Sequence, residues 1–518
     1  MTTTGKVFVL KLGSWGILLL IAAIAVWLKP VSPDSATMAL IANSFNTATI
    51  FEIPLIRGYY DGVPPTFPHF STAYPPAFPA LLWLTSTIVQ VDPLKILPFV
   101  SAVIFVVGVI GWAKLLNVTI REIPGKYGLI ALAVYAALDS SLLEIIGGGR
   151  SLILAWATLG WVLVATQNKV PNWGNALIIG SLSLCTVLAR FEMAPIVGGF
   201  LIWWGLTYKS KLKVMVAGVV LLSGVLMWGM IVHEKTGVFF NSENKYSAVT
   251  VETGVPHLVW HDSGRLPLKS DSDLNKELWE KQRASYAVTN VRTFMKAPIS
   301  WVLLWLGGLT LIIFLKTKPR ASGLSLPLLM GLSALILELM LAVLPFHDSA
   351  YHLVSRTLIF VGILITLAKI GGIPAIPNTI YKHRIYGVSV LVLVSMGLLS
   401  SLIIATEKTQ KLSKDLIYNR ITPFKEISTL PIFKKAVKVA TPEGAFLAYF
   451  NKNINSIYLP TGQNCISGTM QNWLLHYQPD YMITWKNFKV PPTWVLEHQT
   501  ERLNVYKVPI LEDLNANC

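Results

Sequence analysis

The feature that most constrains this chain is a succession of apolar segments, most of them close to the length that crosses a lipid bilayer. A transmembrane helix needs about 20 mostly apolar residues. Hydrophobic residues make up 53% of the 518 residues and charged residues only 14%, a balance unlike that of a water-soluble domain. The sequence therefore predicts a polytopic α-helical membrane protein with about 11 transmembrane helices, at 12–28, 96–113, 128–146, 151–167, 175–190, 193–208, 214–232, 299–315, 325–345, 354–368 and 386–405.

Lysine and arginine side chains gather in every second loop between these segments, and those loops are short. The loop with Lys209, Lys211 and Lys213 is one example. Loops of this kind stay in the cytoplasm. We therefore expect a multi-pass protein of the plasma (inner) membrane with its N-terminus in the cytoplasm and its C-terminus outside. Topology thus accounts for the net charge of +16, and we expect no nucleic-acid partner.

The segment 74–91 is apolar enough to be counted as a further span. Counting it would invert every later loop and place the basic loops outside, against the charge rule. Pro75, Pro76 and Pro79 also restrict where a helix can begin, because proline fits only the first turn. We predict an interfacial or re-entrant helix that belongs to the first outer loop.

The predicted organisation is a transmembrane domain at 1–405, with large outer loops at 30–95 and 233–298, followed by an extracytoplasmic α/β domain at 406–518. In the latter we predict strands at 445–450, 456–459, 481–485 and 504–508, with helices at 423–440 and 469–477 between them. Cys465 and Cys518 fall in this domain, where an oxidising compartment would permit a disulfide. Cys185 lies within a span and is predicted to be a buried thiol.

Asp34 stands immediately after the first apolar segment. A carboxylate at the membrane exit lies where a lipid headgroup would be, and there it can act as a general base. The other interpretation is a helix N-cap, since aspartate before a helical run is a good cap.

Arg190 and Glu192 lie at the turn between two predicted spans, at the outer side. The planar guanidinium of Arg190 suits the phosphate of a lipid donor, and Glu192 is a candidate substrate contact beside it. The alternative is a mutual ion pair at a tight turn. Arg150, at another outer end, is a further phosphate candidate.

The last polar cluster runs from His347 to Arg356. His352 and Arg356 are one helical turn apart and are predicted to share a face. We expect His347 and His352 to contact substrate as polar lining of the site. His347, Asp348 and His352 leave a zinc site open as the alternative.

Two short motifs carry a resemblance to a known family: Pro33-Asp34-Ser35-Ala36 after the first span, and Tyr74-Pro75-Pro76 in the first outer loop. With them the chain resembles the GT-C superfamily of integral-membrane glycosyltransferases. Within it, the bacterial branch of protein mannosyltransferase-like and lipid A aminoarabinose transferase-like enzymes is most similar. The resemblance implies transfer of a sugar from a polyprenyl-phosphate donor to a lipid, glycan or protein acceptor. It also implies that Asp34 is catalytic, that Tyr74 binds substrate and that Arg356 contacts the lipid phosphate.

The chain departs from that family at two places. Ser35 follows Asp34 where many relatives have a second acid, and the stretch from Gly147 to Arg150 stands where some relatives have another acid. A divalent cation is therefore left open and none is assigned. The competing functions are a lipid-linked saccharide flippase or other secondary transporter, and a non-catalytic scaffold. Transporters place charges near the bilayer midplane, whereas here Glu338 is the one clear acid in the middle of a predicted span.

The charge pattern generates a test of topology. A reporter that is active only in the cytoplasm, fused after Cys518, is expected to stay silent because the predicted 406–518 domain faces away from the cytoplasm. The same reporter fused after Lys213 is the positive control. A strongly active fusion after Cys518 would contradict the count of eleven spans.

Overall fold

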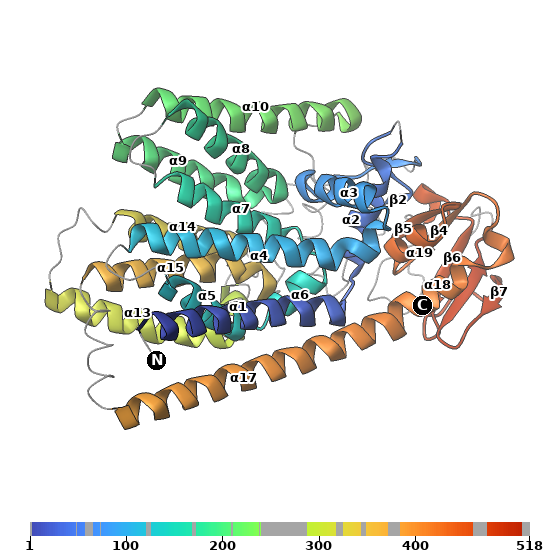
Figure 1. Cartoon of the computed structure of the whole chain (residues 1–518). Helices are drawn as coiled ribbons and strands as arrows, with labels where there is room; N and C mark the ends of the chain where they lie inside the picture. Colours follow the sequence, from blue (N-terminus) through green and yellow to red (C-terminus); the bar gives the residue numbers. More distant parts are fainter. Residues whose placement is uncertain are drawn as a thin grey trace.

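The structure is a computed structural model, and it describes residues 3–47, 49–56, 66–72, 74–120, 126–167, 172–208, 211–237, 239, 287–317, 325–342, 349–370, 384–458 and 474–509. Within these residues the molecule consists of a bundle of long helices and a smaller region built around a mixed sheet (Figure 1). Two short helices, α2 (Pro33–Ser44) and α3 (Ala77–Val89), lie between the bundle and the sheet.

Every predicted span contains a helix, which confirms a mostly helical membrane protein. The bundle helices are α1 (Thr3–Leu28), α4 (Pro93–Thr119), α5 (Lys126–Leu138), α6 (Leu142–Gly147), α7 (Leu152–Ala165), α8 (Trp173–Ala189), α9 (Ala194–Tyr208), α10 (Lys211–Thr236), α13 (Pro298–Thr317), α14 (Ser325–Ala342), α15 (Leu353–Lys369) and α17 (Arg384–Asp415). Among the described residues, 5 helices are long and apolar enough to cross a membrane, or 6 if the bent pair Ala287–Met295 and Pro298–Ile313 is one span. The count of eleven therefore stays a prediction.

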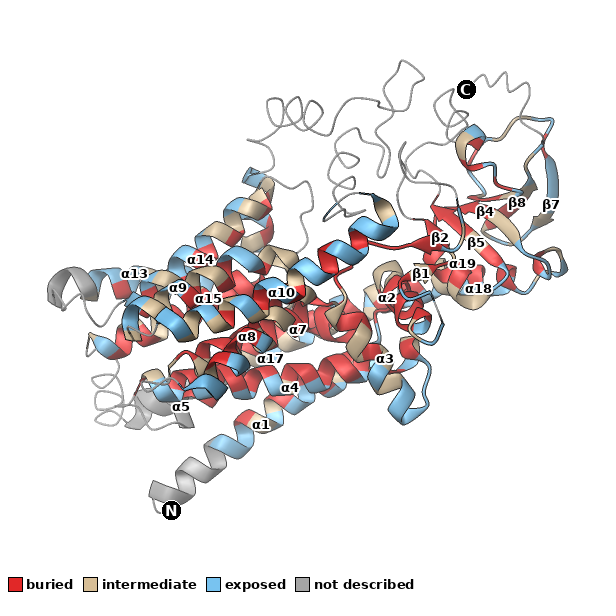
Figure 2. Cartoon of the chain, turned by 90° about the horizontal axis from the view of Figure 1, so that it is seen from above, coloured by how far each residue is buried: buried red, intermediate tan, exposed pale blue. Residues whose placement is uncertain are grey.

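The centre of the bundle is held by large aromatic side chains from α4 and α7. The ring centroids of Trp112 and Trp156 are 6.2 Å apart, and Phe105 stacks on Trp156 at 5.9 Å. These helices approach closely because glycines face the indole rings: a Cβ at Gly160 would lie 2.9 Å from Nε1 of Trp112. Figure 2 shows buried residues along α4 and α7, whereas many residues along the outer faces of α1 and α10 are exposed. Close packing there fixes α7 against α4.

The predicted span 128–146 is wrong as a single helix. It is divided into α5 and α6 by a break at residues 139–141. Asp139 causes the break, because its carboxylate accepts hydrogen bonds from the Ser141 amide at 3.2 Å and the Ser141 hydroxyl at 2.6 Å. Such local bonds give the backbone an alternative to the helix. The chain therefore leaves the helix at Asp139, whose carboxylate is buried.

The helix predicted in 74–91 is present as α3. Pro76 precedes its first residue and Pro79 lies in its first turn, where proline is tolerated. Leu84 and Ile88 are exposed on its surface. Its placement at a membrane interface stays a prediction.

The second region contains a six-stranded sheet with the order β2-β5-β4-β6-β8-β7. Its strands are β2 (Leu55–Ile56), β4 (Val437–Thr441), β5 (Ile454–Tyr458), β6 (Tyr481–Trp485), β7 (Val495–Gln499) and β8 (Leu503–Lys507). The strands β2, β5, β4 and β6 pair in parallel, and β8 and β7 continue the sheet in antiparallel pairing. Because β2 comes from the predicted first outer loop, the sheet extends beyond the predicted 406–518 domain. In that loop β1 (Glu52–Ile53) pairs with β3 (His69–Phe70).

The strands predicted at 456–459, 481–485 and 504–508 correspond to β5, β6 and β8, with Leu459 outside the described residues. The strand predicted at 445–450 is wrong, because this segment is helix α19 (Gly444–Phe450). The helix predicted at 423–440 is only partly present: α18 (Thr422–Ser428) occupies its start, and β4 takes its end. Of the helix predicted at 469–477, residues 474–477 are described and are helical. Cys465 and Cys518 lie outside the described residues, while Cys185 is a free thiol.

Helix α19 joins the sheet region to the rest of the molecule. It packs against α2, and the hydroxyl of Tyr449 donates a hydrogen bond to Asp92. Asp92 also caps α4, accepting from the Leu94 amide at 3.0 Å. The sheet region is thus fixed to α2 and to the start of α4.

The turn between α6 and α7 generates a stability prediction. Gly149 has φ of +63° and a Cβ there would overlap Leu97, so Gly149→Ala combines backbone strain with overpacking. We expect a loss of about 1–3 kcal/mol of stability, measured by thermal unfolding in detergent. Gly218→Ala is the control, because a Cβ at that helical position meets nothing within 4 Å. An unchanged unfolding temperature for Gly149→Ala would contradict the prediction.

Candidate functional site

Asp34 lies in the first turn of α2 and does not cap it. The cap is Ser32, whose hydroxyl accepts from the Ser35 amide at 3.3 Å, while the Ser35 hydroxyl accepts from the Ser32 amide at 3.0 Å. Pro33 occupies the first helical position, which suits proline. The N-cap interpretation of Asp34 is therefore wrong. A partly buried carboxylate at this position is favoured by the helix dipole.

The start of α2 is attached to the turn between α6 and α7. The hydroxyl of Ser35 donates to the carbonyl of Gly148 at 2.6 Å. The turn also lies close to the chain leaving α1, since a Cβ at Gly147 would be 2.6 Å from the carbonyl oxygen of Ala25. Glu144 and Arg150 flank this turn as an ion pair, and their side chains are 18% and 21% exposed. The turn therefore lies against the start of α2 and the end of α1.

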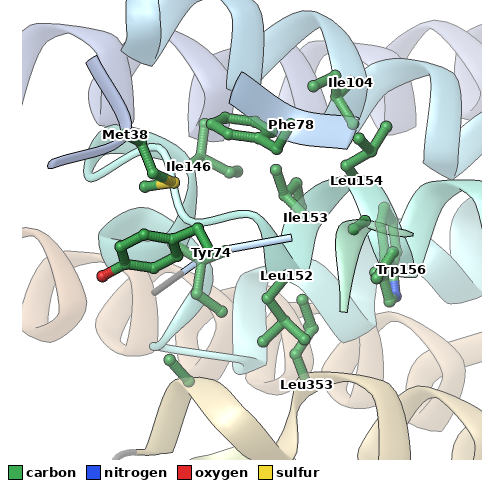
Figure 3. Packing of buried hydrophobic residues seen from close by; sticks show 14 of the residues in the cluster. Met38, Tyr74, Phe78, Ile104, Ile146, Leu152, Ile153, Leu154, Trp156 and Leu353 are labelled. Atoms are coloured by element: carbon green, nitrogen blue, oxygen red, sulfur yellow. The ribbon is translucent and has the colours of Figure 1, made fainter. Parts of the chain in front are cut away.

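Tyr74 is buried against this same region. Figure 3 shows its ring beside Met38 of α2 and Ile146 of α6, with Leu152 of α7 nearby. Met38 is one helical turn after Asp34, so the two share a face of α2. Asp34 is thus one turn before the residue of α2 that lies beside Tyr74 and Ile146.

Arg190 follows the last residue of α8, just before the 3-10 turn η1 (Phe191–Met193). Its guanidinium lies 2.5 Å from Oε1 of Glu192 and 5.1 Å from the ring centroid of Tyr351. Burial alone would lower the pKa of Arg190, but the charge of Glu192, with Tyr351 and Tyr74 contributing, raises it above its ordinary value. Side chains from three segments therefore lie close together here: the 190–192 turn, Tyr351 and Tyr74. The predicted Arg190–Glu192 ion pair is present.

Arg356 lies in the first turn of α15 and is completely buried. Its Nε is 3.0 Å from Oδ2 of Asp139, and its Nη2 is 2.9 Å from Oδ1 of the same carboxylate. A side chain buried in this way does not reach the surface as a snorkelling residue would. Direct contact between Arg356 and a lipid phosphate stays a prediction.

His352 is almost completely buried, with 1% exposure, and its Nδ1 is 2.9 Å from Oε2 of Glu338 in α14. Glu338 also accepts from Asn290 at 3.1 Å and from the hydroxyl of Ser355. His352 therefore faces a different carboxylate from the one that binds Arg356. Its predicted substrate contact stays a prediction.

His347 and Asp348 lie outside the described residues, so the zinc alternative is untested there. Within the ranges that are described, no group of three or more His, Cys, Asp or Glu side chains is arranged to hold a metal ion. Sequence reasoning assigned no role to Asp139, Glu144 or Tyr351. An acid inside an apolar segment is unusual. Asp139 lies near the middle of the predicted span 128–146, so the statement that Glu338 is the one clear acid of that kind is wrong.

No protein-family model matches the chain, and no curated protein matches its sequence. Solved structures do match. ArnT from Cupriavidus metallidurans, bound to undecaprenyl phosphate, is similar over 99% of this chain and 100% of its own, with a TM-score of 0.55 and 11% identity. The archaeal oligosaccharyltransferase AglB from Archaeoglobus fulgidus, in complex with an inhibitory peptide and a dolichol-phosphate, covers 91% of this chain and 69% of its own, with a TM-score of 0.50 and 12% identity. The GT-C resemblance is thus confirmed as a likeness of fold.

Proposed function

We propose that this chain is a glycosyltransferase that moves a sugar from a polyprenyl-phosphate donor to an acceptor at the outer face of the plasma membrane. The observation that carries the proposal is the position of Asp34 on this fold. Its carboxylate follows the first apolar helix directly and is not used as the helix cap. Asp34 is one turn before Met38 in α2, and Met38 lies beside Tyr74 (Figure 3). ArnT, which has a similar fold over its whole length, was solved with undecaprenyl phosphate.

The proposed chemistry is a single displacement at the anomeric carbon of the donor sugar. Asp34 accepts the proton of the acceptor hydroxyl as that oxygen attacks the carbon. The bond from this carbon to the phosphate oxygen breaks, and the polyprenyl phosphate leaves with the electron pair. One carboxylate suffices for such an inverting transfer, because a phosphate leaving group needs little protonation.

Arg190 is the proposed cation for the departing phosphate. Its side chain is 19% exposed, so a ligand can reach it. A guanidinium presents several donors in one plane, which matches the oxygens of a phosphate. Glu192 and Tyr351 hold that plane in place. Tyr74, Glu192 and Arg190 then form the donor side of the site.

A secondary transporter of lipid-linked saccharides is the second candidate. It is favoured by the polar groups inside the bundle, where Glu338 contacts His352 and Asp139 contacts Arg356. Ionisable residues within spans often mark transport pathways. The two functions differ in one product, because a transporter releases no free polyprenyl phosphate.

Asp34→Asn tests the chemistry. The amide is nearly isosteric but cannot accept a proton at neutral pH, so we expect release of polyprenyl phosphate to fall by roughly a hundredfold or more. The assay uses the protein in liposomes with a panel of short-chain polyprenyl-phosphate sugars and a panel of lipid, glycan and peptide acceptors that carry a free hydroxyl. Ser32→Ala is the matched control: it removes the cap at a cost of about 1 kcal/mol in stability and is expected to keep turnover. Wild-type turnover by Asp34→Asn would exclude Asp34 as the base.

Arg190→Lys tests the donor side. Lysine keeps the charge but loses the planar fork, so we expect binding of undecaprenyl phosphate in detergent to weaken about tenfold. Arg420→Lys is the control, because Arg420 pairs with Glu443 at 3.0 Å in the sheet region and its replacement is expected to leave binding unchanged. Equal affinities for wild type and Arg190→Lys would remove Arg190 from the proposed site.

A further inference from the structure

We infer that the Asp139–Arg356 pair is a positioning device that fixes the base side of the site relative to the phosphate side. The inference rests on the proposed function. Asp139 and Arg356 come from separate parts of the chain, the break between α5 and α6 and the first turn of α15. Neither residue is proposed to touch the substrate.

The carboxylate of Asp139 is saturated with donors. Besides the two bonds from Arg356 and the two from Ser141, it accepts from the hydroxyl of Tyr135 at 3.0 Å. Arg356 also donates to the Ser141 hydroxyl at 2.8 Å. A bidentate pair with this many supporting bonds has one preferred geometry.

A second layer joins the pair to α7. The hydroxyl of Thr357 donates to the oxygen of Tyr135 at 2.9 Å, and the indole of Trp156 donates to Thr357 at 2.9 Å. All three side chains are buried. The orientation of Asp139 is therefore set by α5, α7 and α15 together.

Each member of the pair is close in sequence to one side of the site. From Asp139 the chain runs through the short helix α6 to Gly148, whose carbonyl accepts from Ser35 beside Asp34. From Arg356, about one turn back along the chain lies Tyr351, whose ring faces Arg190. The Asp139–Arg356 pair thus links two parts of the proposed site. One is the Gly148 turn, which lies beside Asp34, and the other is Tyr351, whose ring contacts Arg190.

Burial separates this role from direct phosphate binding. The side chains of Arg356 and Asp139 are both 0% exposed, whereas those of Arg190 and Glu192 are 19% and 29% exposed. Arg356 holds Asp139 through Nε and Nη2, no part of either side chain is exposed to a ligand, and breaking the pair in this low-dielectric interior would leave an unpaired charge. Arg190 is partly exposed, so a ligand can reach it without leaving a fully buried charge unpaired.

The test is the neutral double variant Asp139→Asn/Arg356→Gln in the full-length protein. It removes both charges together, so no unpaired charge is buried, but it loses the rigid fork. We expect undecaprenyl phosphate to bind within threefold of wild type while kcat for polyprenyl phosphate release falls at least tenfold with little change in KM. The control is Arg420→Gln/Glu443→Gln, which neutralises the ion pair in the sheet region and is expected to keep both properties.

Two results would overturn the inference. Wild-type kcat in the double variant would make the pair a structural contact only, and a loss of undecaprenyl phosphate binding of tenfold or more would make Arg356 a direct ligand. If the double variant does not fold, Tyr135→Phe decides: it removes one donor to Asp139 without changing charge. A lowered kcat with unchanged lipid binding supports the positioning role, and a wild-type kcat contradicts it. Failure of the proposed function is distinguishable, because wild-type protein would then release no polyprenyl phosphate.

Discussion

An ionised side chain inside a low-dielectric bundle is stable only beside a partner of opposite charge, and the described part of this molecule is organised around that constraint. Arg356 and Asp139 pair with no exposure to solvent, and leaving either charge alone in such a place costs about 3–5 kcal/mol. The break between α5 and α6 must therefore lie against the first turn of α15. Arg190 and Glu192 pair where they remain partly exposed, so that pair can exchange partners with a ligand at a smaller cost. The fully buried Arg356–Asp139 pair is thus suited to holding helices in place, and the partly exposed Arg190–Glu192 pair is suited to binding a ligand.

The long helices were predictable because each one needs a run of apolar residues that stands out against short basic loops. The elements that were missed lack such a local signal. Helix α19 is a run of six apolar residues after Gly444, and periodicity does not separate a short buried helix from a buried strand. Strand β2 has two residues and pairs with β5, far away in the sequence. Its existence depends on tertiary pairing that composition does not encode.

In the candidate site, too, residues with a local sequence signal could be predicted and contacts that depend on tertiary packing could not. Asp34 and Arg190 were found because a charge at the end of an apolar segment is conspicuous. Asp139 lay within a predicted span, yet its partner could not be identified, because Arg356 approaches it only after α5 and α15 have packed. The sequence left Asp34 open as the cap of α2, since Ser32 and Asp34 are both good capping residues and backbone geometry alone decides between them.

The pairing of β2 with β5 has a consequence for the order in which the molecule is made. Leu55 is synthesised early and its partner Ser456 late, so nearly the whole bundle leaves the ribosome before this contact can form. Contacts between residues so far apart in sequence form slowly, because a long loop must close first. Until then the segment around β2 presents an unpaired edge, which is the kind of surface that associates wrongly during biogenesis. The sheet is therefore completed late, only after the chain has been synthesised as far as β5.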